Sequence, residues 1–440
     1  MRALRARLRI TTVVAATGIY AVVCGWTARD LWFWWDEISL LRAQRVPRFE
    51  LQGFLGAWLP GGRVVFQLLQ QILGNSYGWY VGLNAVLAVL AAILVADSLS
   101  SDGGALQPRS MVWAVTAAFV TSTSALSNVM YAAEAGRWLS ILVVLSTMWI
   151  ERRALSYWIT PIAITVSGIV WLSSALPMAI VASVLARPDL PARRKRRRAT
   201  VNLACALAIT IVGRAVAGRF PAVQEPVLAD SGPAVGVLVR DVGPIFGRSV
   251  VAWVVHVLTP IAPGLWSRDD WARRLFDVLL PLRWLVVLAI ALVVSDRLLR
   301  RRRIPGAFPA LGLLGIAAAI VARGWGWLGT GPELRYGNVT APLAIAFWCA
   351  VWAELRRRRS PASRWSARVL ATLAISVVII NVAQFPRTVS RLAGTDWHVG
   401  SAAQKRALAG CVSSDDQRTL VVYPNQSGEE LCEFYLDLED

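Results

Sequence analysis

Residues 78–98 read "GWYVGLNAVLAVLAAILVADS", and this run decides the class of fold. It is long enough to cross a membrane as a helix, which takes roughly 20 apolar residues. The whole chain shares this character, since 56% of its 440 residues are hydrophobic and only 17% are charged. Soluble domains usually carry about 25% charged residues. The sequence therefore predicts an all-α polytopic membrane protein.

Clusters of basic residues between the apolar runs predict the topology. The formal charge of +19 is concentrated in short clusters that adjoin hydrophobic segments. This placement favours a role in membrane orientation over the binding of nucleic acid. Positive loops stay on the cytoplasmic side. The clusters lie at residues 2–9, 152–153, 193–198, 300–303 and 356–359.

Apolar length and the parity of crossings predict about eleven spans, with the N-terminus inside and the C-terminus outside. Because residues 152–153 and 193–198 are both basic, an even number of crossings must lie between them. Two short helices that meet near residues 171–174 satisfy this requirement. The first span lacks a good cleavage site and is interpreted as uncleaved. The spans are expected at 8–28, 78–98, 111–129, 136–150, 155–170, 173–187, 199–217, 276–297, 307–324, 337–354 and 366–384.

The same topology divides the chain into a membrane domain, residues 1–384, and an outer C-terminal module, residues 385–440. Residues 29–77 and 218–275 become outer loops. Apolar spacing in the first favours helices that lie flat against the membrane. Prolines interrupt the apolar stretch of the second, which is interpreted as a helix at the interface or dipping into it. The C-terminal module contains helix-like "QKRALAGC" and strand-like "TLVVYP", which predict a small α/β unit.

Cysteine positions fit this division. Cys24, Cys205 and Cys349 fall in apolar spans, where a thiol acts as a small hydrophobe. Cys411 and Cys432 are the two cysteines of the polar tail, and a disulfide between them suits an oxidising compartment.

The stretch "WFWWDEISLL" at residues 32–41 follows the first span and places two carboxylates at the outer interface. Tryptophan is favoured at that interface. A carboxylate just past a helix end is often simply solvated. Here an aromatic wall that includes Trp35 adjoins Asp36 and Glu37, lowers the local dielectric constant and offers a surface to a sugar ring or lipid. This arrangement favours Asp36 or Glu37 as a general base.

Further polar residues collect on the same outer side. The rule that positive loops stay on the cytoplasmic side does not explain arginine on the outer side. Arginine binds phosphate oxygens in pairs and stays charged at a membrane surface, so an anionic headgroup is one explanation. The other explanation is that the loop charges are solvated or paired with each other. Both explanations stay open. The residues are Arg63, Glu134, Arg137, Arg335 and Tyr336.

This pattern resembles the GT-C-type integral membrane glycosyltransferases, which use a polyprenyl-phosphate sugar as donor. The matching features are the acidic pair in "WWDE" of the first outer loop, interfacial helices, many further spans, "ELRYGN" at 333–338 and the outer C-terminal module. The resemblance implies Asp36 as the catalytic carboxylate, with Glu37 as its neighbour or substitute. It also implies Arg335 with Tyr336 as the phosphate ligands, assisted by Arg63 or Arg137.

The resemblance further implies an inverting hexosyl- or pentosyltransferase of a bacterial plasma membrane, whose site faces outside. Its acceptor would be a cell-envelope glycan or lipid, and membrane lipids would surround the protein. The arginine-rich, lysine-poor composition looks actinobacterial. A divalent cation, Mg²⁺ or Mn²⁺, that bridges the pair to the phosphate stays an open alternative, because the sequence shows no ligand cluster beyond Asp36 and Glu37.

Two other classes compete with a transferase. A transporter or flippase for a phosphate-bearing lipid would also need many helices and outer arginines, but its polar residues should lie deeper in the membrane. A scaffold for envelope assembly leaves the polar outer loops unexplained. The two histidines, His256 and His398, disfavour a histidine-based site, and no glycine-rich nucleotide loop is present.

Overall fold

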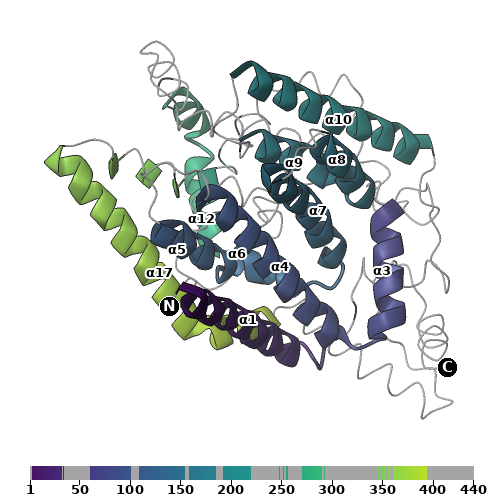
Figure 1. Cartoon of the computed structure of the whole chain (residues 1–440), viewed down its shortest axis with the longest axis horizontal. Coiled ribbons are helices and arrows are strands. Elements are labelled where there is room, and N and C mark those ends of the chain that lie inside the picture. The colour runs from purple at the N-terminus through teal and green to yellow at the C-terminus, as the bar shows by residue number, and fades with distance from the viewer. Residues whose placement is uncertain are drawn as a thin grey trace.

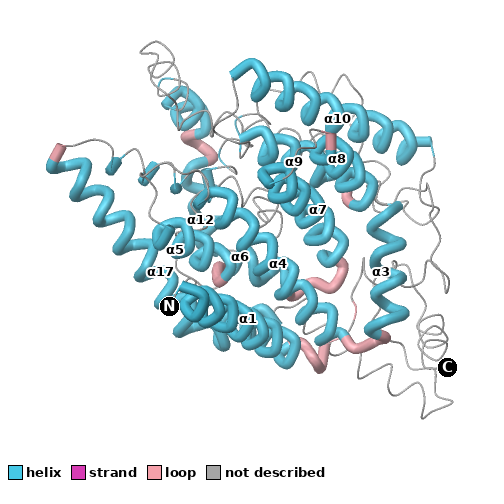
Figure 2. Tube along the Cα trace, in the orientation of Figure 1, coloured by secondary structure: helices cyan, strands magenta, loops and turns pink. Residues whose placement is uncertain are grey.

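The computed structural model describes residues 2–31, 33, 60–100, 109–153, 158–184, 192–219, 270–289 and 360–393, with isolated residues at 247–255, 292 and 345–356. The described part is mostly helical and contains no strand (Figure 2). The predicted helical class is therefore confirmed for these residues. Most of the predicted α/β module lies outside them, and its first residues, 385–393, continue a helix instead.

Most of the described helices pack into one bundle around α4 (Figure 1). Helix α4 contacts α1, α5 and α7, while α8, α9 and α10 pack against one another and α17 packs on α5. The helices are α1 (Arg2–Thr27), α4 (Tyr77–Ser100), α5 (Arg109–Val120), α6 (Thr123–Val129), α7 (Glu134–Arg153), α8 (Ile159–Val170), α9 (Leu172–Val184), α10 (Ala192–Arg219) and α17 (Pro361–Ala393).

The two ends of the bundle carry different residues. At one end, which we call the α3 end, helix α3 (Pro60–Leu73) runs across the beginnings of α4 and α7 and the turn between α8 and α9 (Figure 1). At the other, the arginine end, the last turn of α7 meets the beginnings of α8 and α10 through Glu151. The basic clusters 152–153 and 193–198 both lie at the arginine end.

A close crossing of α1 and α4 fixes the α3 end of the bundle. A Cβ added to Gly25 would lie 2.7 Å from the carbonyl oxygen of Gly78, and one added to Gly78 would lie 2.6 Å from that of Gly25. A side chain at either position would therefore force the two backbones apart. Small residues permit such close approach between helices that pack in membranes.

The predicted span 111–129 is wrong in one respect, because the chain breaks at Thr121 and Ser122 and forms two helices, α5 and α6. The Ser122 hydroxyl accepts a hydrogen bond from the backbone N–H of Ala125. Carbonyl oxygens near the break accept hydrogen bonds from other helices: Tyr20 donates to Val120, and Asn381 donates to Ala118. The break is thus stabilised by side chains that are distant in the sequence.

The other helix boundaries agree with the predicted spans to different degrees. Helices α8 and α9 meet at Trp171, within the predicted turn. The predicted span 276–297 instead begins earlier, as α12 (Asp270–Leu279), and is interrupted before a further helical stretch at 283–289. In the segment 218–275, which was predicted as an outer loop, Val251 and Val255 are buried against Phe276 of α12.

Two helices of the described part are long and apolar enough to span a membrane, at Tyr77–Asp97 and Pro361–Ser390. Shorter apolar helices cover Thr11–Thr27, Ile159–Val170 and Ser174–Ser183. Length and apolar composition alone do not establish that a helix spans a membrane, so a membrane fold of about eleven spans stays a prediction.

Candidate functional site

Helix α3 buries two of its polar side chains. Arg63 and Gln67 are one helical turn apart, and both are buried, with Phe66 between them. On the opposite side, Leu68 is half exposed and Ile72 is 77% exposed. A helix that packs on a protein usually buries its apolar stripe and exposes its polar face. The pattern of α3 is mixed, because Phe66 is also buried and Gln71 is exposed; the helix brings Arg63 and Gln67 into the interior and presents Leu68 and Ile72 to its surroundings.

The first turn of α7 supplies a buried ion pair. The Arg137 Nη1 atom lies 2.9 Å from Glu134 Oε1, and both side chains are only 2–3% exposed. A carboxylate at the beginning of a helix is favoured by the helix dipole. The guanidinium of Arg137 also lies over the Trp171 ring, with its carbon 4.7 Å from the ring centroid. The ion pair and the aromatic ring thus fix the Arg137 side chain on two sides.

Three glycines allow α3 to approach this pair. A Cβ added to Gly136 would lie 3.3 Å from the Trp171 ring and 3.5 Å from the Cα of Gly62. A Cβ on Gly61 would lie 3.1 Å from the Cα of Val170. The backbones of α3, α7 and α8 therefore meet at this point. We use the name buried charge cluster for residues of the elements that meet at this contact, namely buried Arg63 and Gln67 of α3, the Glu134–Arg137 pair of α7 and partly buried Trp171.

Helix α4 holds the turn that leads into α7. The Asn84 amide donates to the carbonyl oxygen of Tyr131, at 2.7 Å, and to that of Val129. The Tyr77 hydroxyl donates to the carbonyl oxygen of Met130, at 3.1 Å. These contacts fix the position from which Glu134 begins α7.

The turn that leads to the ion pair packs against the beginning of α4, where exposed and buried side chains alternate. Trp79 is 66% exposed near the beginning of α4, whereas Asn84 is fully buried. The helix rises about 8 Å between them. The turn before Glu134 contacts α4 through Asn84 and also through Tyr77, so it spans the first two turns of α4.

The chain after α1 enters the α3 end beside the cluster. Phe33 is fully buried, and its ring packs edge-on against Phe66, Tyr77 and Tyr80 at centroid distances of 5.2–6.0 Å. Phe66 lies one turn from Arg63 on α3. Phe33 is the last described residue before the carboxylate pair.

Three of the predicted site residues are brought into one region: Arg63, Glu134 and Arg137. They were expected in outer loops or in a helix at the interface. Instead Glu134 and Arg137 belong to helix α7, and all three side chains are buried, because the glycine contacts close α3 over them. The remaining predicted residues lie outside the described ones: Trp35, Asp36, Glu37, Arg335, Tyr336, Cys411 and Cys432.

Several residues that form or position the buried charge cluster were not predicted from the sequence. Gln67 follows Arg63 by one helical turn, and this spacing could have marked it. Asn84 is the one amide in the apolar run 78–98, which is also a usable signal. Nothing in the sequence singles out Trp171 as the partner of Arg137. The part of the chain that the structure describes contains no group of three or more His, Cys, Asp or Glu side chains placed to hold a metal ion.

No family model, curated protein sequence or solved structure matches the chain.

Proposed function

We propose that the protein is a polytopic membrane glycosyltransferase of the GT-C type. It moves a sugar from a polyprenyl-phosphate donor to a cell-envelope glycan or lipid, at the α3 end of the bundle and on the outer face of a bacterial plasma membrane. The observation that carries the proposal is the pair of buried arginines, Arg63 and Arg137, beside the buried segment that leads to Asp36 and Glu37.

Exposed side chains support the placement in a membrane. Trp26 and Trp79 are exposed at the α3 end, and Trp158 and Trp365 are exposed at the arginine end. Tryptophan is enriched at both interfaces of a membrane. Soluble monomers rarely expose large apolar patches, yet the surface between these tryptophans is rich in apolar residues. Exposed examples are Val14, Ile19, Val22, Ile162, Leu207, Ile211, Val212, Leu373, Ile375, Ile379 and Val382.

The positive-inside rule assigns the arginine end to the cytoplasm and the α3 end to the outside. Single cysteines at exposed positions test this orientation. In a chain with all five native cysteines replaced by serine, we expect a membrane-impermeant maleimide to label Gln71→Cys on α3 in intact cells. Ser360→Cys, at the beginning of α17, should react only after permeabilisation. Labelling of both from one side, or the reverse order, would refute the orientation.

The chemistry of the buried charge cluster suits a phosphate leaving group. Arginine presents a planar fork of donors that matches phosphate oxygens. Both arginines are buried, Arg63 on α3 and Arg137 on α7, where Glu134 and the Trp171 ring contact Arg137. In this proposal Arg63 contacts the donor phosphate, and Arg137 contributes positive potential from a fixed position. Arg335 and Tyr336 are proposed as further phosphate ligands.

The catalytic carboxylate is proposed to come from Asp36 or Glu37, with Trp35 as a surface for the sugar. Asp36 follows Phe33 by three residues, which limits the distance between their Cα atoms to about 11 Å. Phe33 itself packs on Phe66, one turn from Arg63. The chain connectivity thus permits a carboxylate and an arginine to act on the same donor.

The proposed reaction is a single displacement. Asp36 or Glu37 takes the proton of the acceptor hydroxyl, and the hydroxyl oxygen forms a bond to the anomeric carbon. The bond from that carbon to the phosphate oxygen breaks, and its electron pair leaves with polyprenyl phosphate. Arg63 stabilises the negative charge that develops on the phosphate. Attack opposite the leaving group inverts the configuration of the anomeric carbon.

Replacing Arg63 tests the phosphate role. With labelled polyprenyl-phosphate sugars and isolated membranes, we expect Arg63→Gln to lower sugar transfer by about 100- to 1,000-fold, as for the loss of one preorganised donor. Arg63→Lys should retain part of the activity, because it keeps the charge but loses the fork. Gln71→Ala, on the exposed side of the same helix, is the control and should leave transfer unchanged. Full transfer by Arg63→Gln would exclude the assigned role.

The alternative function is a transporter or flippase for a phosphate-bearing lipid. Transporters often use broken helices whose freed backbone groups bind the substrate or ion. The α5–α6 break has this form, but the Val120 and Ala118 carbonyl oxygens already accept hydrogen bonds from Tyr20 and Asn381. This satisfied break favours the transferase.

A further inference from the structure

The first turns of α10 place positive charge where a helix disfavours it. Arg193, Arg194, Arg196 and Arg197 are all exposed, and the first turn contains no acidic residue. The beginning of a helix carries a partial positive charge, so cations there are unfavourable. Like charges three or four residues apart also repel each other, as Arg193 does Arg196 and Arg197. A bound anion would relieve both effects.

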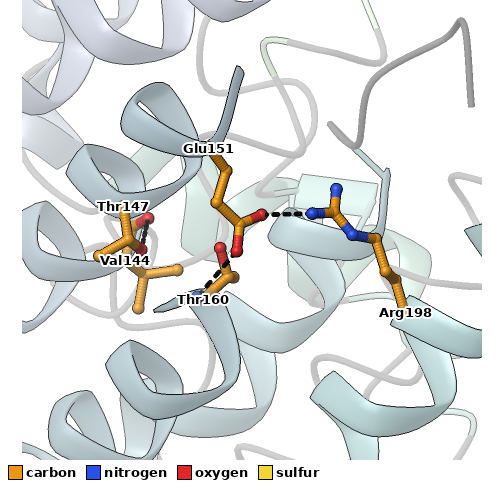
Figure 3. Close-up of polar contacts among 5 residues, drawn as sticks. All are labelled: Val144, Thr147, Glu151, Thr160 and Arg198. Atoms are coloured by element: carbon orange, nitrogen blue, oxygen red, sulfur yellow. Dashed lines mark hydrogen bonds and ion pairs between the residues drawn. The ribbon is translucent and has the colours of Figure 1, made fainter. Parts of the chain in front are cut away.

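Glu151 does not neutralise these four arginines, because its two oxygens have other partners. Glu151 Oε2 lies 2.9 Å from Arg198 Nη2, and Glu151 Oε1 accepts the backbone N–H of Thr160 at 3.0 Å (Figure 3). Glu151 is buried, and Arg198 is half buried. These contacts fix the beginning of α10 against α7 and α8. Arg198 is thereby turned inward, and the other four arginines remain exposed on the same two turns.

We propose that Arg193, Arg194, Arg196 and Arg197 form a docking surface for the phosphate groups of anionic membrane lipids. A basic cluster that adjoins a membrane span attracts anionic headgroups. The inference requires that the chain lies in a membrane, but it does not depend on glycosyl transfer.

The rest of α10 favours a lipid over a soluble polyanion. After the basic turns the helix exposes Leu207, Ile211 and Val212. Leu207 lies about 15 Å beyond Arg197 along the helix axis. Trp158, at the beginning of the neighbouring α8, is also exposed at the arginine end. One helix therefore offers charge for a headgroup and an apolar surface for the acyl chains beneath it.

The test measures hydrogen–deuterium exchange of the full chain in nanodiscs. One set of nanodiscs contains phosphatidylcholine alone. The other set contains phosphatidylcholine and phosphatidylglycerol in equal amounts. We expect the anionic lipid to slow exchange at residues 192–200 of the wild type by about tenfold. Replacement of all four arginines by glutamine should remove this difference, and replacement of all four by lysine should retain it. The glutamine variant should also exchange no faster than the wild type in phosphatidylcholine, since its repulsion is relieved.

Two results would overturn the proposal. One is an equal response to anionic lipid in the glutamine variant and the wild type. The other is an equal slowing of exchange when inorganic phosphate is added to phosphatidylcholine nanodiscs, which would assign the arginines to a soluble anion. Loss of sugar transfer plays no part in these outcomes, so a failed transferase assignment would be seen separately.

Discussion

Replacing Glu134 by glutamine is expected to lower the free energy of unfolding by about 3–5 kcal/mol, as when one partner of a buried ion pair is removed. Glu134 and Arg137 lie 2.9 Å apart and are almost fully buried, so the guanidinium would lose its nearest carboxylate without gaining water. Denaturant unfolding of the chain in nanodiscs measures the change.

The exposed pair of Arg29 and Asp30 is the matched control. Their side chains are 48% and 82% exposed, at 3.4 Å. Exposed pairs contribute roughly 0–1 kcal/mol. Asp30→Asn should therefore have little effect on unfolding, and an equally small effect of Glu134→Gln would contradict the buried position of the pair.

A double variant separates stability from function at the same pair. Replacing a buried ion pair by apolar side chains of similar size is often neutral or stabilising. We therefore expect Glu134→Leu with Arg137→Met to unfold like the wild type but to transfer little sugar, because the positive potential of Arg137 is gone. A folded double variant with wild-type transfer would limit the pair to packing.

The second large effect is expected at the carboxylate pair. Asp36→Asn or Glu37→Gln, whichever removes the base, should lower sugar transfer by about 100- to 10,000-fold, the contribution of a positioned general base. The acceptor hydroxyl has a high pKa and must lose its proton during attack. The variant with the larger loss identifies the base.

Asp30→Asn also serves as the control for this experiment, because Asp30 is an exposed carboxylate on the same stretch of chain. Each variant is compared with it in membranes that contain equal amounts of protein. If both single variants and the double variant transfer sugar as fast as Asp30→Asn, neither carboxylate is the base.

Much of the helical arrangement follows from local sequence. The run 78–98 became α4, and the basic flanks of 155–187 required the paired short helices that meet at Trp171. The break between α5 and α6 was not predictable in this way. It depends on Tyr20 and Asn381, whose helices meet α5 only in the folded bundle.

The candidate site was predictable as a set of residues but not as a geometry. The topology predicted from the sequence placed Arg63, Glu134 and Arg137 on one side of the membrane. The structure places them at one end of the bundle. Their burial arises because Gly62 and Gly136 let α3 close against α7. A local pattern of charges gives no information on such a contact between distant segments.

The most direct test of the proposed transferase uses the purified full chain in vesicles, with a donor labelled separately in its sugar and in its lipid. For a transferase, we expect the sugar label to move to the acceptor while an equal amount of labelled polyprenyl phosphate is released. Passage of the intact donor across the membrane, with both labels still joined and no release of polyprenyl phosphate, would contradict a transferase and identify a flippase.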